Sequence, residues 1–203
     1  MIGREKKVTW KNGTLSSEGL LSRGSSDRGV VICHPHPQMG GSMYNNVVET
    51  IQRVYARHQD STLRFNFRGV GESTGFYSEG RGETNDISSA CDYIKSIGVG
   101  EIVLAGYSFG AWVCLNLLKE DHPDIASVIF ISPPDKYFPF DWTGLTHAPD
   151  LIVCGNQDPF CDVSAMKMIA RKYAIPLAVI EGGDHFYMGN EDQLAEILEG
   201  KMC

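Results

Sequence analysis

The sequence has 203 residues, 42% of them hydrophobic and 21% charged, and this composition excludes a largely disordered chain. The formal net charge is −7, and no basic run is longer than Lys6-Lys7. We therefore expect no nucleic-acid partner, because phosphate binding needs clustered lysine and arginine. The length allows one sizeable core, so we expect a single domain over residues 1–203.

Short apolar runs typical of strands alternate along the chain with segments typical of helices. Residues 7–10 and 19–21 flank Asn12-Gly13 and are predicted to form a hairpin. The pattern then predicts strands at 29–33, 62–67, 101–105, 126–131, 151–154 and 176–180, and helices at 45–58, 84–97, 109–119, 163–173 and 191–198. Strands joined through helices need parallel crossovers, so the predicted fold class is α/β, a doubly wound, mostly parallel sheet with helices on both faces.

The compartment is inferred from the start of the chain, its hydropathy and its cysteines. The first ten residues carry charges but no apolar segment follows them, so no secretory signal is predicted. No apolar stretch approaches the 18 residues of a membrane span, so we expect no membrane partner. The six cysteines form no Cys-x-x-Cys pair, and Cys33 and Cys154 lie in strand-like runs. These features favour a reduced, cytoplasmic protein.

A candidate nucleophile follows the predicted strand at 101–105. Residues 106–110 read Gly-Tyr-Ser-Phe-Gly and stand between that strand and a predicted helix. A catalytic serine needs a sharp turn that projects its hydroxyl from the strand end, and the two glycines let strand and helix approach closely. The motif is weak alone, but this context predicts that Ser108 is a nucleophile. The alternative is a tight glycine–serine turn without chemistry.

A serine nucleophile needs a base and an acid that orients the base. Of the six histidines, only His185 lies in the loop after the last predicted strand, and Asp158 follows the strand at 151–154. The order serine, aspartate, histidine is that of the α/β-hydrolases. Asp162 and Asp184 are rival acids. Asp162 is expected to cap the next helix, and the Asp184 side chain should diverge from that of its neighbour, His185.

Two backbone N–H groups are predicted to form an oxyanion hole. One belongs to Phe109, directly after the nucleophile. The other should lie in the loop after the strand at 29–33, which reads His-Pro-His-Pro-Gln. Because proline has no N–H, His36 is the first choice and Gln38 the second. The two histidines of this loop are alternative metal ligands, but no carboxylate stands near them and we predict no metal site.

The loop after the strand at 62–67 has the appearance of a dinucleotide-binding motif. Its glycines at 69 and 71 should be followed by a third at 74, where Thr74 stands, and no helix is predicted to begin there. We therefore interpret it as a structured loop, in which Arg68 is expected to bond backbone carbonyls.

In this order, the His-Pro-His-Pro, Asn-x-Arg-Gly-x-Gly-x-Ser and Gly-Tyr-Ser-Phe-Gly motifs and the Asp158–His185 pair resemble the α/β-hydrolase superfamily over about residues 8–198. More narrowly, the chain is similar to small, nearly cap-less bacterial hydrolases related to dienelactone hydrolases. The resemblance implies a twisted sheet of about eight strands and hydrolysis of esters or related acyl compounds through an acyl-serine intermediate, without a cofactor. Dienelactone hydrolases have a cysteine where this chain has Ser108, which argues against a dienelactone substrate.

The expected substrate is a small-molecule acyl compound, specifically a small or short-chain carboxylic ester. The segment 133–150 is too short for a large helical cap, which indicates a minimal lid over an open site. We predict an acyl pocket walled by four aromatic residues, Phe140, Trp142, Phe160 and Phe186, although these rings could instead pack the loop onto the sheet.

The sequence is also compatible with several alternatives. The same residues could cleave a thioester, amide or lactone or transfer an acyl group, and a catalytically silent binding module on a hydrolase scaffold is an alternative from another class. An edge strand near 177–181 is a candidate for pairing across a two-fold axis in a homodimer, although no residue pattern requires it.

Overall fold

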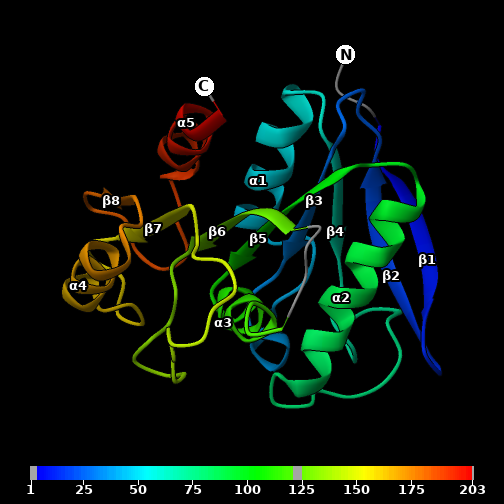
Figure 1. Cartoon of the computed structure of the whole chain (residues 1–203), viewed down its shortest axis with the longest axis horizontal. Coiled ribbons are helices and arrows are strands. Elements are labelled where there is room, and N and C mark those ends of the chain that lie inside the picture. The colour runs from blue at the N-terminus through cyan, green and yellow to red at the C-terminus, as the bar shows by residue number, and fades with distance from the viewer. Residues whose placement is uncertain (1–3, 121–124, 203) are drawn as a thin grey trace.

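The computed structural model describes residues 4–120 and 125–202, and in it eight strands form one sheet in the order β1-β2-β4-β3-β5-β6-β7-β8 (Figure 1). The strands are β1 (Lys6–Asn12), β2 (Leu15–Ser22), β3 (Arg28–Cys33), β4 (Ser61–Phe65), β5 (Glu101–Tyr107), β6 (Ile125–Ile131), β7 (Leu151–Gly155) and β8 (Leu177–Ile180). The β1–β2 and β2–β4 pairs are antiparallel, and all pairs from β4 to β8 are parallel. The predicted mostly parallel sheet of about eight strands is confirmed.

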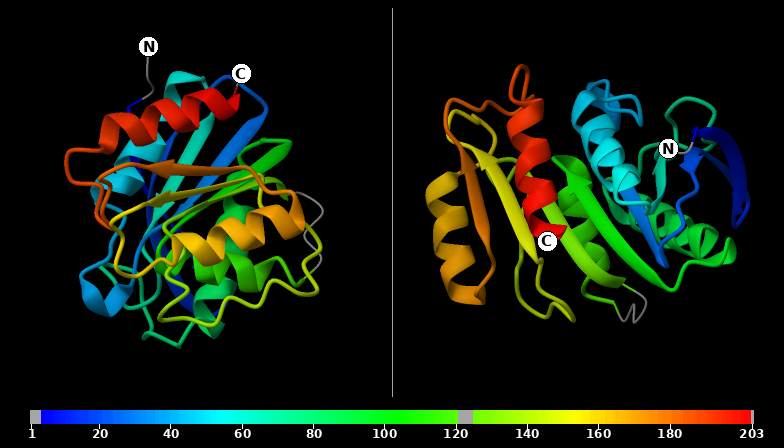
Figure 2. Two further views of the ribbon diagram at one scale, coloured as in Figure 1. Left: turned by 90° about the vertical axis from the view of Figure 1, so that its left-hand side faces the viewer. Right: turned by 90° about the horizontal axis from the view of Figure 1, so that it is seen from above.

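Helices cover both faces of this sheet, as the predicted crossovers require (Figures 1 and 2). One face carries α1 (Asn46–Arg57) and α5 (Glu191–Met202), and the other carries α2 (Arg81–Ser96), α3 (Phe109–Leu117) and α4 (Val163–Tyr173). Each face has its own apolar core, because alternate side chains of the buried strands point to opposite faces. None of the helices described is long and apolar enough to cross a membrane.

Every predicted strand and helix is present, with ends displaced by up to four residues. The largest displacement at a helix start is at α2, which begins at Arg81 rather than at residue 84. The cause is Glu83, whose carboxylate accepts the backbone N–H groups of Ser78 at 2.8 Å and Gly80 at 2.9 Å and so caps the helix end. A short 3₁₀ helix, η1 (Pro37–Met39), was not predicted.

The expectation for Arg68 was wrong. Its guanidinium pairs with the Asp86 carboxylate, with Nη2 at 2.8 Å from Oδ1, and Asp86 also accepts the Arg68 backbone N–H at 3.0 Å. A buried carboxylate on α2 is a stronger partner for a guanidinium than loop carbonyls. The pair fastens the loop after β4 to α2.

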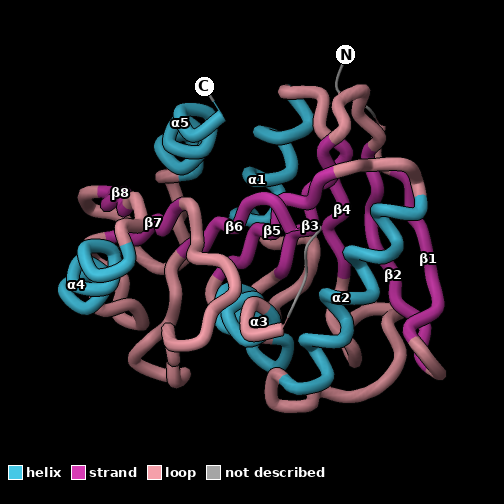
Figure 3. Tube along the Cα trace, viewed as in Figure 1, coloured by secondary structure: helices cyan, strands magenta, loops and turns pink. Residues whose placement is uncertain are grey.

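The loops that carry the predicted site residues all leave the carboxyl ends of parallel strands. Ser108 follows β5, Asp158 follows β7, His185 follows β8 and His36 follows β3. Parallel strands end at one edge of the sheet, so residues distant in sequence meet there. Between β6 and β7, residues 132–150 contain no helix or strand (Figure 3), so no helical cap covers this edge from that segment.

Candidate active site

Ser108 stands directly between β5 and α3 on a strained turn. Its backbone has φ 55° and ψ −120°, which residues other than glycine rarely adopt. The flanking glycines are required by close contacts. A Cβ on Gly106 would lie 2.6 Å from Ala111 Cα, and one on Gly110 would lie 2.4 Å from Cys33 O. The turn therefore depends on both glycines, as the motif predicted.

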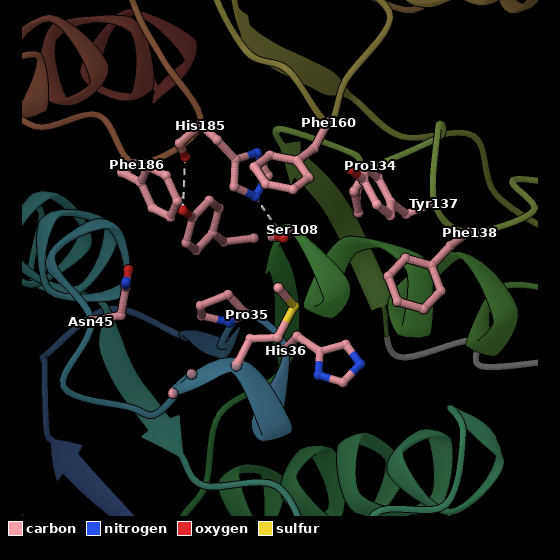
Figure 4. Close-up of a pocket in the computed structure, with 14 residues that line it drawn as sticks. Pro35, His36, Asn45, Ser108, Pro134, Tyr137, Phe138, Phe160, His185 and Phe186 are labelled. Atoms are coloured by element: carbon pink, nitrogen blue, oxygen red, sulfur yellow. Dashed lines mark hydrogen bonds between the residues drawn. The ribbon is translucent and has the colours of Figure 1, made fainter.

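The three residues predicted for catalysis form one hydrogen-bonded series (Figure 4). His185 Nε2 lies 2.8 Å from Ser108 Oγ, and His185 Nδ1 lies 2.8 Å from Asp158 Oδ2. A carboxylate only accepts hydrogen bonds, so the proton of the neutral imidazole sits on Nδ1 and Nε2 faces the hydroxyl as an acceptor. All three side chains are buried.

The Asp158 carboxylate is held from several sides. Its Oδ1 accepts the backbone N–H groups of Phe160 at 2.8 Å and Cys161 at 3.2 Å. Burial alone would favour the neutral acid, but hydrogen bonds from the His185 and Ser132 side chains and the Phe160 N–H outweigh it and lower the pKa of Asp158. The carboxylate is therefore ionised and fixed in orientation at neutral pH.

Both rival acids have structural roles. Asp162 is the N-cap of α4, where its Oδ1 accepts the N–H groups of Ser164 at 2.9 Å and Ala165 at 3.2 Å. Asp184 Oδ1 accepts the N–H groups of Phe186 at 2.9 Å and Tyr187 at 2.8 Å. Neither carboxylate bonds to the His185 ring, whose Nδ1 faces Asp158.

The two backbone N–H groups predicted for the oxyanion hole, those of Phe109 and His36, remain candidates for binding an oxyanion. Phe109 is the first residue of α3, where a backbone N–H has no acceptor within the helix. In the loop after β3, the Gln38 N–H is already bonded to His36 Nδ1 at 3.2 Å, which removes the second choice. The His36 N–H has no hydrogen-bond acceptor within residues 4–120 and 125–202.

His34 begins this loop and is completely buried. Its Nε2 accepts the Phe67 backbone N–H at 3.0 Å, so the proton of the neutral ring sits on Nδ1, which lies 2.6 Å from Pro35 O. Burial lowers the pKa of His34 to about 4. The ring therefore supports the loop as a neutral bridge between β3 and the chain after β4.

We expect His34 to make the protein less stable in acid, by about 2 kcal/mol in the free energy of unfolding between pH 7 and pH 5. The unfolded chain binds a proton near the ordinary pKa of 6.5, whereas the folded protein binds it only near 4, so acid favours unfolding over that interval. Urea unfolding of the wild type and of His34→Gln at both pH values measures the effect. Equal losses in the two proteins would contradict it.

A cavity of about 420 Å³ opens beside Ser108 and His185 (Figure 4). Most of its wall consists of aromatic rings, prolines and glycine backbone. Besides Ser108 and His185, the lining residues are Pro35, His36, Met39, Gly40, Gly41, Asn45, Tyr107, Pro134, Tyr137, Phe138, Phe160 and Phe186. The site is therefore a largely apolar cleft around Ser108 and His185, with His36 and Asn45 as the other polar side chains in its wall.

Of the four aromatic residues predicted to wall this pocket, only Phe160 and Phe186 line it. Phe140 and Trp142 pack inward instead, with the Trp142 ring 5.9 Å from Phe140 and 6.0 Å from Phe130 between centroids. A hydrogen bond fastens the chain just before these two rings to α3, because Trp112 Nε1 donates to Pro139 O at 3.1 Å. This contact turns the rings of Phe140 and Trp142 toward the core.

Sequence reasoning missed several residues of the wall, among them Met39, Asn45 and Pro134. They lie between β3 and α1 and in the loop after β6, beyond the carboxyl ends of parallel strands, where such sheets bind their ligands. The sequence of such loops has no periodicity from which the side chains that face the cavity could be predicted.

Comparisons with known proteins agree with this architecture. Residues 30–150 match the sequence model of the Alpha/beta hydrolase family. An alpha-beta serine hydrolase homologue from Coxiella burnetii is 30% identical, with a TM-score of 0.89 and 100% of both chains covered. A serine hydrolase without lid from Xanthomonas campestris is 24% identical, with a TM-score of 0.88 and 98% of this chain and 94% of that chain covered, a likeness of fold. An uncharacterized protein of Rickettsia prowazekii is 28% identical in an alignment 195 residues long, which covers 89% of this chain and 82% of that protein.

The match to the family's sequence model spans more than half of the chain, from β3 through the nucleophile turn to the residue before β7. The chain belongs to the alpha/beta hydrolase family.

Proposed function

We propose that the protein is a serine hydrolase that cleaves small or short-chain carboxylic esters through an acyl-serine intermediate. The observation that carries this proposal is the continuous series from Ser108 Oγ through the His185 ring to the Asp158 carboxylate, with both contacts at 2.8 Å. This is the arrangement that raises the nucleophilicity of a serine hydroxyl.

In the first half of the reaction, His185 Nε2 takes the proton of Ser108 as the hydroxyl oxygen attacks the ester carbonyl. The backbone N–H groups of Phe109 and His36 bind the negative oxygen of the tetrahedral intermediate. The protonated ring then gives its proton to the leaving alcohol, and Asp158 stabilises the ring while it is charged.

In the second half, a water molecule attacks the acyl-serine. His185 Nε2 takes a proton from this water and returns it to Ser108 Oγ as the carboxylic acid leaves. The open cavity gives water access to the acyl-enzyme, so hydrolysis is favoured over transfer to a bound acceptor.

Two assays test this function. The wild type should hydrolyse p-nitrophenyl acetate and butyrate, and a fluorophosphonate should label one serine, identified by peptide mass as Ser108. A protein that neither hydrolyses these esters nor takes the label would overturn the proposal. Labelling without ester hydrolysis would retain the nucleophile but reject the ester class.

A series of p-nitrophenyl esters of increasing chain length should show a maximum among the short acyl chains. Each methylene that enters the apolar cavity is worth about 0.8 kcal/mol, or roughly fourfold in kcat/KM. A chain that outgrows the cavity of about 420 Å³ meets no helical cap from residues 132–150, so further methylenes stay in water and gain nothing. Values of kcat/KM that still rise at acyl chains of twelve or more carbons would contradict a short-chain preference.

A further inference from the structure

Tyr107 is the residue directly before the nucleophile, and its side chain reaches the loop that carries the base, the His185 loop (181–190). Its hydroxyl donates to the backbone carbonyl of His185, with Oη 2.8 Å from that oxygen (Figure 4). A carbonyl oxygen only accepts hydrogen bonds, so the tyrosine is the donor. The bond spans the sheet, because β6 and β7 stand between β5, which ends at Tyr107, and β8, which leads to the His185 loop.

The His185 loop is also held by two other parts of the protein. From the acid's loop, the Gln157 backbone N–H donates to Gly183 O at 2.9 Å. From the start of α1, Asn46 Nδ2 donates to Phe186 O at 2.9 Å. In the part of the chain that the structure describes, only the bond from Tyr107 ties the backbone of this loop to the strand of the nucleophile.

The Tyr107 hydroxyl is a permanent donor that has no second task. The side chain is almost completely buried, and its ring centroid lies 5.6 Å from that of His185. Burial raises the pKa of Tyr107, so the hydroxyl keeps its proton between pH 5 and pH 9. Tyr107 also lines the cavity, but its one proton is already bonded to His185 O. It therefore contributes a ring to the wall and no free donor for a substrate.

We propose that Tyr107 is a positioning residue for the base, whose hydroxyl fixes the backbone of His185 relative to Ser108. The proposal rests on the function proposed above. Tyr107 and Ser108 are neighbours on one turn, so any shift of that turn carries the nucleophile and the anchor of the base together. The bond thereby keeps His185 Nε2 at 2.8 Å from Ser108 Oγ, the distance at which the proton is transferred.

The nucleophile motif does not itself explain this tyrosine. The turn needs glycine at 106 and 110 and allows any residue at 107. A ring that only filled space there could be phenylalanine as well as tyrosine. A purely structural hydroxyl would change the fraction of protein that is folded, whereas a positioning hydroxyl changes the rate at which each folded molecule reacts.

The test compares the wild type with Tyr107→Phe, Asp158→Asn and the double variant. Thr84→Val is the matched control, because the buried Thr84 hydroxyl also donates to a backbone carbonyl at 2.8 Å, that of Gly80, and lies on α2 outside the cavity wall. The readouts are the rate constant and the end point of fluorophosphonate labelling of Ser108 at pH 8, kcat and KM for p-nitrophenyl butyrate, and the thermal midpoint. The end point counts the folded molecules, and the rate constant measures how fast each of them reacts.

For Tyr107→Phe we expect the labelling rate constant and kcat to fall about tenfold, the loss that one buried hydrogen bond supports. The end point should stay complete, and KM should hold because the ring remains in the wall. Thr84→Val should lose a similar amount in thermal midpoint, about 3 °C, and should label at the wild-type rate. In Asp158→Asn the ring no longer acts as a base, so adding Tyr107→Phe should slow labelling by less than about twofold.

A wild-type rate constant in Tyr107→Phe would overturn the proposal, and so would a loss confined to the end point. A full tenfold loss in the Asp158→Asn background would overturn it too, because the hydroxyl would then act independently of the base. A wild type that takes the label but hydrolyses no ester would count against the ester function and not against this proposal, since labelling alone reports on the base. A wild type that takes no label would overturn both.

Discussion

Replacing Ser108 with alanine is expected to lower kcat for p-nitrophenyl butyrate by about 10⁶-fold. The variant lacks the oxygen that forms the acyl intermediate, and His185 Nε2, 2.8 Å away in the wild type, has no proton to remove. Any residual rate would come from binding and the oxyanion donors alone, typically about 10³-fold above water. The measurement is initial rates at pH 8, with the fluorophosphonate label followed by intact mass.

The stability of variants at this position separates a catalytic loss from a folding defect. Ser108→Ala keeps the positive φ and should unfold like the wild type, whereas Ser108→Gly relieves the strain and should gain about 1 kcal/mol while remaining inactive. Ser164→Ala, at an exposed position of α4, is the matched control and should keep full activity. If Ser108→Ala retained the wild-type rate, the nucleophile would have to be sought elsewhere.

The parts of this site that could be predicted from sequence are those fixed by local chemistry. The Ser108 turn can be recognised in the sequence because it needs a glycine two residues before and two residues after the serine, between a buried strand and a helix. Asp158 and His185 follow from chain order once the strands are placed, because parallel strands deliver their following loops to one edge. The buried strands are placed by the short length of their apolar runs and by the turn residues that flank them, because periodicity alone does not separate such runs from buried helices.

The parts that could not be predicted depend on contacts between distant segments. Trp142 lies in an irregular segment without periodicity, so only its packing against Phe130 shows that it belongs to the core. Arg68 has Asp86 as its partner because α2 crosses near the loop, which no spacing reveals. The bond from Tyr107 to the His185 carbonyl joins positions 78 residues apart, and the nucleophile motif allows any residue at 107.

The second large effect is expected from Asp158→Asn, which should lower kcat about 10⁴-fold although it changes one atom. In the wild type, Oδ1 accepts two backbone N–H groups and Oδ2 accepts His185 Nδ1–H. An asparagine has only one oxygen for these two sides. Its amide group should place that oxygen toward Phe160 and Cys161, where two fixed donors stand, and turn its NH₂ toward the imidazole. Nδ1 must then accept, the ring proton moves to Nε2, and the ring can no longer remove the proton of Ser108.

The orientation of the amide, and not the loss of charge, is therefore the main cause of the expected effect. Asp158→Asn should unfold in urea much like the wild type, and fluorophosphonate labelling should fall in parallel with kcat, because both reactions need an unprotonated Nε2. A smaller loss, of less than about tenfold, would mean that the ring keeps its tautomer without the carboxylate. The Asp162→Asn variant is a suitable comparison, since Asp162 caps α4 through the same kind of acceptor and asparagine caps a helix as well as aspartate. It should leave kcat unchanged, which would locate the effect in the single carboxylate that faces His185.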